Sequence, residues 1–239
     1  MQLLRQEFKF YISNEQIMFL RHSLNKFMKL DENTNKDKNN YTITSLYFDS
    51  PNNDAFNEKV DGVYAREKFR IRKYSESDII KFESKKKIEN VIYKTSFILD
   101  EETVKNLSKN NMQLLTSGKS KFLDKSFAII KSNGLRAKNI VEYDREAYYL
   151  PYGNIRITFD TNLRTYNSNN DFFDKKKPYT SIFHHKINIL EIKHSLPLPE
   201  HLKIILRKIT ANRCAISKFV LSDKYTNYSP YQDNIVEPS

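Results

Sequence analysis

The sequence contains little cysteine, glycine or proline, and no long apolar run. Cys214 is its only cysteine, so the chain cannot form an internal disulfide or a cysteine-based metal site, which fits a reducing compartment. With 4 Gly and 7 Pro in 239 residues, it is not a low-complexity or fibrous chain. No stretch has the apolar length that spans a bilayer, and the N-terminus lacks the apolar run of a signal peptide. We therefore expect a cytoplasmic protein, peripheral to the membrane at most, through a membrane-protein partner.

Positive charge and aromatic residues are abundant instead. The formal net charge of +11 predicts an anionic partner, which would be nucleic acid, an anionic membrane surface or a phosphate-rich molecule. The 16 Phe and 15 Tyr supply enough apolar area for a core. No linker separates two cores and no repeat is visible, so we expect one domain over residues 1–222. A flexible C-terminal tail is expected over 223–239, where the chain becomes polar and contains Pro230 and Pro238.

The most informative stretch runs from Arg66 to Arg72. Read as a strand, with side chains alternating between two faces, it places four basic residues together: Arg66, Lys68, Arg70 and Arg72. The segments 80–87 and 92–97 continue the alternation of lysines and apolar residues. Neighbouring strands that carry like charges on a shared face repel one another. The arrangement becomes favourable when that face binds a dense polyanion.

Similar alternation predicts further strands over 5–12, 41–48, 140–149, 154–160 and 187–193. Apolar stripes at helical spacing predict helices after Ser13, at 55–60, after Asp100, over 121–131 and after Pro199. Residues 162–180 read as a long polar loop, and Asp49 and Asp160 lie at strand ends, where we expect them to cap turns. The chain is therefore expected to fold as one antiparallel, β-rich α+β domain.

Two arrangements of this sheet are compatible with the pattern. In a half-buried sheet, the charged faces meet water and the apolar faces meet the core. The uniform sign of the charges favours the reverse, with helices on the apolar faces and a barrel that has a basic interior. A barrel of about eight strands can hold one small ligand. Glu7, Glu83 and Glu191 lie on the same faces, either as ligands of Mg²⁺ or Mn²⁺ or as ion-pair partners of the cations.

A series of short motifs runs through the chain in a fixed order. They are Arg5-x-Glu7-x-Lys9, Ser45-Leu46-Tyr47-Phe48-Asp49, Asp61-Gly62, Arg66-x-Lys68-x-Arg70-x-Arg72, Glu83-x-Lys85, Tyr143-x-Arg145, Arg156-x-Thr158-x-Asp160, Glu191-x-Lys193 and Ser217-Lys218-Phe219. Each motif is weak alone. Together, in this order, they resemble the VTC domain, the catalytic domain of the vacuolar transporter chaperone polyphosphate polymerase, within the triphosphate tunnel metalloenzymes.

This resemblance implies a closed antiparallel β-barrel, a tunnel of about eight strands with flanking helices. The tunnel would bind ATP, triphosphate or polyphosphate together with Mn²⁺ or Mg²⁺, and Glu191 would hold the metal. The residues that would contact phosphate are Lys9, Arg66, Arg70, Arg72, Lys85, Arg145, Arg156, Lys193 and Lys218. Among them, we expect a catalytic role for Arg70, Arg72, Lys85, Arg156 and Lys193.

Lys68 and Lys94 join the expected substrate-binding set. Related chains often carry a second basic residue two positions after Lys94, where this chain has Ser96. Lys68 or Lys87 would then supply the missing phosphate contact.

The leading prediction is a metal-dependent phosphoryltransferase that synthesises polyphosphate from ATP. One alternative is a tripolyphosphatase or nucleoside triphosphatase that uses the same tunnel. Another is a non-catalytic polyphosphate-binding module. Nucleic acid is disfavoured as a partner, because the sequence contains no RNP-type motif, zinc finger or basic helix.

Overall fold

The computed structural model describes residues 5–32, 34–35, 37–89, 91–111, 118, 120–167, 172–174, 178–183 and 187–227. Its helices are α1 (Asn14–Leu24), α2 (Asp54–Val60), α3 (Glu101–Ser108), α4 (Lys121–Ser132), α5 (Glu200–Arg207) and α6 (Lys218–Asn227). Its strands are β1 (Gln6–Ile12), β2 (Lys29–Leu30), β3 (Tyr41–Asp49), β4 (Ala65–Tyr74), β5 (Ser77–Ile88), β6 (Val91–Leu99), β7 (Arg136–Leu150), β8 (Ile155–Asn167), β9 (Thr180–Ser181) and β10 (Asn188–His194). None of the described helices has the length and apolarity that crossing a membrane demands.

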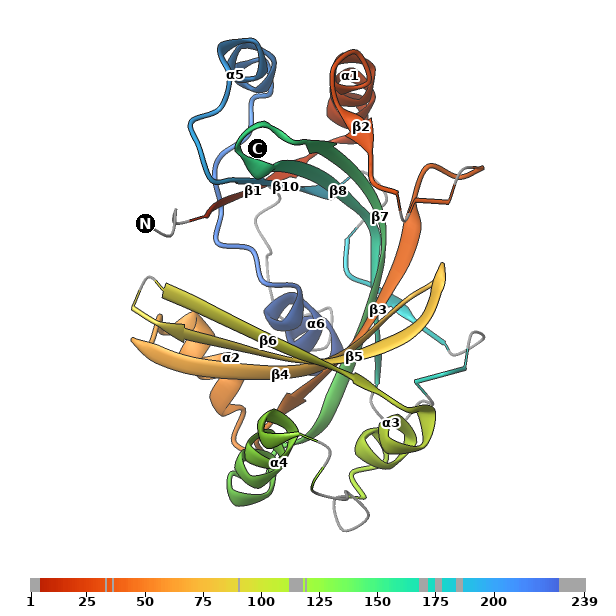
Figure 1. The fold of residues 1–239 in the computed structure, drawn as a ribbon, viewed down its shortest axis with the longest axis vertical. Helices are drawn as coiled ribbons and strands as arrows, with labels where there is room; N and C mark the ends of the chain where they lie inside the picture. The colour runs from red at the N-terminus through yellow and green to blue at the C-terminus, as the bar shows by residue number, and fades with distance from the viewer. Residues whose placement is uncertain are drawn as a thin grey trace.

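One antiparallel sheet dominates the fold. Its strands follow the order β1-β10-β8-β7-β3-β4-β5-β6, while β2 pairs with β7 and β9 pairs with β8. Figure 1 shows the sheet curled into an arch, with β1, β10 and β8 in one arm and β4, β5 and β6 in the other. The long strands β7 and β3 bend between the two arms. The prediction of an antiparallel sheet with flanking helices is therefore confirmed.

The predicted closure of the barrel is wrong. In the described part of the chain, β6 pairs with β5 alone and no ladder joins it to β1, so the sheet is a half-barrel. The segment between α5 and α6 lies along the outer edge of β1 instead. Phe10 forms a β-bridge with Arg213, and the amide of Cys214 donates to the Lys9 carbonyl at 2.9 Å. Because these residues use the backbone groups of β1, that edge is not available to β6.

Helices cover the convex side of both arms. α1 and α5 pack on the arm that contains β1, β10 and β8, in a cluster centred on Leu20, Phe159 and Leu202. A capping box begins α1: the backbone N–H of Gln16 donates to Ser13 Oγ at 3.3 Å, and the backbone N–H of Ser13 donates to Gln16 Oε1 at 2.9 Å.

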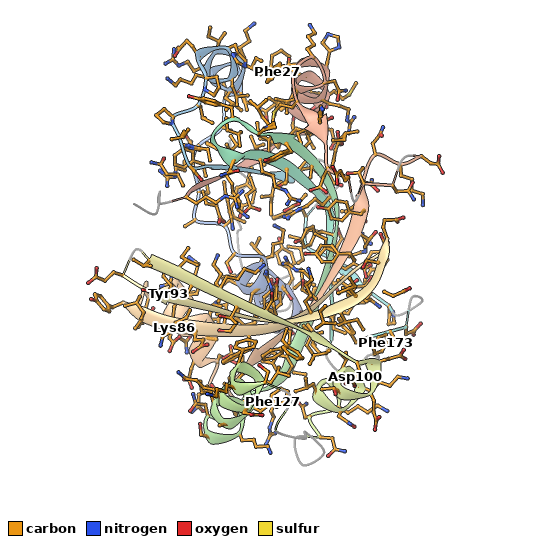
Figure 2. The ribbon with its side chains drawn as sticks, in the orientation of Figure 1. Phe27, Lys86, Tyr93, Asp100, Phe127 and Phe173 are labelled. Atoms are coloured by element: carbon orange, nitrogen blue, oxygen red, sulfur yellow. The ribbon has the colours of Figure 1, made fainter. Side chains whose placement is uncertain are left out.

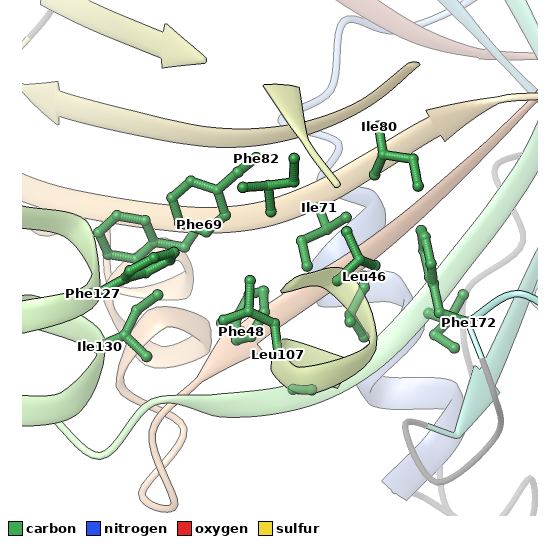
Figure 3. Close-up of a cluster of buried hydrophobic side chains, with 14 of the residues drawn as sticks. Leu46, Phe48, Phe69, Ile71, Ile80, Phe82, Leu107, Phe127, Ile130 and Phe172 are labelled. Atoms are coloured by element: carbon green, nitrogen blue, oxygen red, sulfur yellow. The ribbon is translucent and has the colours of Figure 1, made fainter. Parts of the chain in front are cut away.

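The convex side of the other arm rests on α3 and α4. Figure 3 shows Phe69 of β4 and Phe82 of β5 beside Phe127 of α4, with Leu107 of α3 nearby. The rings of Phe69 and Phe82 stack with their centroids 5.8 Å apart. Each such buried ring contributes about 1.5–3 kcal/mol. Because the apolar residues of β4 and β5 face these helices, their alternating basic residues point to the concave side of the arch.

The concave side holds a helix where the sequence predicted a tail. α6 packs against β7 and β8, with Phe219 buried in a cluster that includes Tyr143. Asp223 is also buried: it accepts a hydrogen bond from Asn139 Nδ2 at 3.2 Å and forms an ion pair with Lys138, whose Nζ lies 2.6 Å away. The predicted tail boundary at 223 therefore falls too early, inside α6. The rest of the predicted tail, 228–239, lies outside the described residues.

The predicted loop over 162–180 is shorter than expected, because β8 continues to Asn167. Asn162 has a φ of 51° beside a register shift between β7 and β8, and this left-handed residue lets the strand continue past a bulge. Leu163 and Tyr166 beyond it are buried. Residues 168–171 and 175–177 of the predicted loop lie outside the described residues.

Candidate functional site

A cavity of about 750 Å³ occupies the concave side of the half-barrel. Its wall comes from both arms of the arch, from α2 and from the residues that lead into α6. Twelve basic side chains and three carboxylates, those of Glu7, Glu83 and Glu191, line it. Such an excess of cations around one cavity creates a strongly positive potential, which attracts a dense anion.

Most of the predicted site residues meet in this cavity. The lining includes Lys9, Arg66, Lys68, Arg70, Arg72, Lys85, Arg145, Glu191, Lys193 and Lys218. Arg156 and Lys94 are not part of it. Arg156 forms an ion pair with Asp31 at 2.8 Å and donates to the Tyr41 hydroxyl at 2.9 Å. Lys94 is half-exposed and forms an ion pair with Glu83 at 2.6 Å.

One group of cations in the wall is matched by carboxylates, and we call it the acid-paired cluster. It lies on β1, β7, β8, β10 and the first residue of α6, and consists of Lys9, Arg145, Lys193 and Lys218 with Glu7, Asp160 and Glu191. Glu191 is buried at its centre, with Lys193 Nζ 2.7 Å from Oε1 and Arg145 Nη2 3.3 Å from Oε2. Burial alone would raise the pKa of this carboxyl, but Lys193, Lys9 and Arg145 hold it well below its usual range.

Asp160 anchors the other end of the acid-paired cluster. Its side chain is fully buried and accepts two hydrogen bonds from Arg145, at 2.6 and 2.7 Å. Lys218 Nζ lies 2.6 Å from the same carboxylate. Burial would raise the pKa of Asp160, but the positive charges of Arg145 and Lys218 lower it. This carboxylate thus fixes α6 and β7 relative to one another at the base of the cavity.

Glu83 organises the arginines of β4. Arg70 Nε lies 2.6 Å from its carboxylate and Arg72 Nη1 lies 3.9 Å away, while Lys94 approaches from β6. Arg70 also donates to the Tyr47 hydroxyl at 3.3 Å. Despite burial, which raises it, the pKa of Glu83 falls to about 2 because of Arg70, Arg72 and Lys94. Glu83 is therefore an ion-pair partner of the arginines of β4, one of the two roles that the sequence left open for it.

A second group of cations has no such partners, and we call it the unpaired cluster. It lies on α2, β4 and β5, in the lower arm of Figure 1, and consists of Lys59, Arg66, Lys68, Lys85 and Lys87. Within the described residues, none of these five forms an ion pair. Burial lowers the pKa of Lys59, because the charged amine loses water and its neighbours are cations. Burial also lowers the pKa of Lys85, and the negative charge of Glu7 offsets this only in part.

Lys68 is the most exceptional member of the unpaired cluster. Its Nζ is buried and, within the described structure, has no hydrogen-bond partner. It lies 4.6 Å from the centroid of the Phe219 ring, a contact that attracts a cation but offers no acceptor. Burial lowers the pKa of this amine to about 7. A buried polar group without a partner is costly, so this amine is suited to an anion that enters the cavity.

Comparison with known proteins agrees with this geometry. A sequence model of the VTC domain matches residues 4–226. The chain belongs to the VTC-domain family. No curated protein matches it.

Two solved structures show the same fold as this VTC domain. One is from Hippeastrum, HpAC1, named as an adenylyl cyclase and described as having a dominant triphosphatase activity. It is 15% identical, covers 92% of this chain and 95% of its own, and has a TM-score of 0.54. The other, named as an adenylate cyclase from Bacillus halodurans, is 13% identical, covers 95% of this chain and 100% of its own, and also has a TM-score of 0.54.

The carboxylates of this VTC domain fit one kind of metal site. Among the described residues, no group of three or more His, Cys, Asp or Glu side chains comes together, so an all-protein cage for a metal is not present there. Mg²⁺ and Mn²⁺ are often held by one or two carboxylates, with water and phosphate oxygens completing the shell. Glu191 offers such a carboxylate to the cavity, and Glu7 lines the same cavity. The two share one partner, because Lys193 Nζ lies 2.7 Å from Glu191 Oε1 and 3.9 Å from Glu7 Oε2.

Several lining residues of the VTC domain were missed by sequence reasoning. Lys59 lies on α2, where no alternation marks it, and Arg213 lies on the segment beside β1. Asp160 was expected to cap a turn, but it is the buried partner of Arg145. Asp49 caps its turn, because its Oδ1 accepts the backbone N–H of Ser50 at 2.8 Å, and it also accepts the N–H of Ala55 in the first turn of α2 at 2.7 Å. The residues that lie on alternating strand positions were thus the ones that a pattern could find.

Proposed function

We propose that this VTC domain is a metal-dependent phosphoryltransferase that synthesises polyphosphate from ATP. One observation carries the proposal: the five cations of the unpaired cluster share one cavity with Glu191. The unpaired cluster suits the binding of a phosphate chain, and Glu191 suits the placing of a divalent metal at one end of that chain. The VTC-domain match supports a phosphate-handling function.

The cavity has the parts that this transfer requires. The β–γ phosphoanhydride bond of ATP breaks, a terminal oxygen of the acceptor chain bonds to the γ-phosphorus, and ADP leaves. Arg70 and Arg72 can donate two hydrogen bonds each to equatorial phosphate oxygens, whereas Lys68 and Lys85 provide mobile point charges. Catalysis then rests on alignment and on stabilising charge that spreads over the transferred group. Glu191 would hold Mg²⁺ or Mn²⁺, which supplies further neutralisation of that charge.

The ionised state of Glu191 favours a phosphate acceptor over water. A terminal phosphate oxygen is already anionic and needs no base, whereas an attacking water must lose a proton. The pKa of Glu191 is held well below its usual range, by Lys193 above all, so its carboxylate is a poor base. The acid-paired cluster therefore stabilises charge without accepting protons.

One observation favours hydrolysis as the second candidate. Burial lowers the pKa of Lys68 to about 7, so a fraction of this amine is neutral near neutral pH. A neutral amine beside the cavity can accept a proton from water. The triphosphatase activity described for the Hippeastrum protein also supports this alternative. In that case the acceptor is water, and the products are ADP and inorganic phosphate, or shorter phosphates from tripolyphosphate.

Product analysis separates these functions. The purified protein is incubated with ATP and Mn²⁺, with and without a short polyphosphate primer, and the phosphates are resolved by length. Long chains are the expected result, and they should be lost in Arg70→Ala. If inorganic phosphate is the only product, the protein is a hydrolase and not a polymerase. If the protein binds tripolyphosphate tightly but turns over neither substrate with any metal, it is a non-catalytic polyphosphate-binding module.

A further inference from the structure

The two edge strands of the sheet, β1 and β6, differ in whether another segment covers their outer side. β1 has its outer edge covered by the segment that contains Arg213 and Cys214. β6 pairs with β5 on one side and, among the described residues, with nothing on the other. An uncovered strand edge exposes a row of amide and carbonyl groups that can pair with another strand. Of the two edges, β6 is therefore the one open to a partner.

The side chains of β6 are unusual for an unprotected edge. Val91, Ile92, Tyr93 and Ile98 are exposed, and Figure 2 shows Tyr93 near the end of the β5–β6 hairpin, away from α3 and α4. Lys94 is the only charged residue among the nine of this strand. The strand contains no proline, and its register with β5 has no bulge. Apart from the single charge of Lys94, it therefore lacks the devices by which natural sheets prevent edge pairing.

We propose that β6 pairs antiparallel with β6 of a second copy, about a two-fold axis at Thr95. Residues opposite one another must face the same side of the sheet, so the axis passes through a residue and not between two. Thr95 is the central residue of Val91–Leu99, and only this register pairs the whole strand. An axis at Lys94 would place two like charges directly opposite, which is unfavourable.

The register about Thr95 is self-complementary. Ile92 lies opposite Ile98 of the second copy, and Tyr93 lies opposite Phe97, so each exposed apolar side chain gains an apolar partner. Lys94 lies opposite Ser96, so the single charge of the strand meets no like charge and keeps its ion pair with Glu83. The same face of β6 that continues the cavity wall stays concave. The second copy thus extends the wall formed by β4, β5 and β6, and this inference does not depend on the proposed function.

Cysteine cross-linking tests the axis directly. In a Cys214→Ser background, Thr95→Cys brings two thiols together across the two-fold, with Cα atoms about 4.5–5.5 Å apart, as in any directly opposed antiparallel pair. A disulfide accepts roughly 4.4–6.8 Å. Val91→Cys is the matched control, because it lies on the same face of the same strand but opposite Leu99. Under mild oxidation we expect a covalent dimer from Thr95→Cys and none from Val91→Cys. Equal cross-linking of both variants, or of neither, would overturn the proposal.

The mass in solution provides an independent test. Light scattering should give twice the 28.4 kDa of one chain for the wild type. Ile98→Glu places a carboxylate against Ile92 of the second copy and should give a monomer that keeps the wild-type circular dichroism. Adding Ile92→Lys places a lysine opposite each new glutamate and should restore the dimer. Ile204→Glu, at an exposed position of α5, should leave the dimer unchanged. A monomeric wild type, or a double variant no more dimeric than Ile98→Glu, would reject the interface.

Discussion

The acid-paired and unpaired clusters use the same two residue types in the same cavity, and yet they differ in what holds them. In the acid-paired cluster, each cation lies within ion-pair distance of a carboxylate. In the unpaired cluster, none does within the described residues, and burial lowers the pKa of Lys59, Lys68 and Lys85. Every cation of the first cluster has a carboxylate partner without a ligand, whereas those of the second gain a partner only when an anion arrives.

The difference assigns separate tasks to the two arms of the arch. A complete network is rigid and fixes geometry, so the acid-paired cluster presents Glu191 at a constant position beside the cavity. The unpaired cluster contributes binding free energy instead, because a bound anion supplies the partners that its desolvated cations lack in the free protein. We therefore expect changes in the acid-paired cluster to affect stability and turnover, and changes in the unpaired cluster to affect ligand affinity.

The largest effect is expected from Asp160→Asn. This change leaves the buried charge of Lys218 without its carboxylate and leaves Arg145 with Glu191 alone, so it should lower the free energy of unfolding by about 3–5 kcal/mol. Urea denaturation measures the loss. The control is Glu101→Gln, which breaks only an exposed pair with Lys105 and should cost less than about 0.5 kcal/mol. Similar stability of both variants would mean that the acid-paired cluster does not hold the fold.

Glu191→Gln should separate turnover from binding. The amide keeps the shape of the side chain but weakens the proposed metal site, so kcat/KM with Mn²⁺ should fall by roughly a hundredfold or more. Tripolyphosphate affinity in the presence of EDTA should stay equal or improve, because a negative charge has left the cavity. Calorimetry gives the affinity and product release gives the turnover. Unchanged activity would remove Glu191 from the metal site.

Lys68→Met should have the opposite signature. It removes one charge-assisted hydrogen bond to phosphate, so tripolyphosphate affinity should fall by about 10–100-fold, corresponding to about 1.5–3 kcal/mol. The free energy of unfolding should be equal or higher, since an unpartnered buried amine has been replaced by an apolar chain. Lys86→Met, on the outer face of the β5–β6 hairpin in Figure 2, is the matched control and should bind normally. Loss of stability with unchanged affinity would contradict the division of tasks.

The sequence predicted the parts of this site that follow a strand period. Alternation along 66–72 and 80–87 identified the basic faces, because Phe69 and Phe82 on the opposite faces require helices to pack on. It did not identify Lys59, which lies on a short helix, or the role of Asp160. The sequence also could not predict that the barrel is open, because closure depends on which distant segment pairs with the outer edge of β1. That segment is 213–214, and no local pattern marks it.

The smallest effect is the pH dependence of ligand binding, and it tests the unpaired cluster most specifically. Burial lowers the pKa of Lys68 to about 7 in the free protein, and a bound phosphate raises it again by stabilising the charged form. Above pH 7, binding must therefore take up a proton, and tripolyphosphate affinity should fall by at most about tenfold per pH unit up to the pKa of the complex. Below pH 7 the amine is already charged in the free protein, so its contribution to the pH dependence disappears.

Calorimetry in two buffers of different ionisation enthalpy counts the protons that binding takes up. Proton uptake at pH 8 that is the same in wild type and Lys68→Met would show that another group titrates, and Lys85, whose pKa burial also lowers, is the next to test.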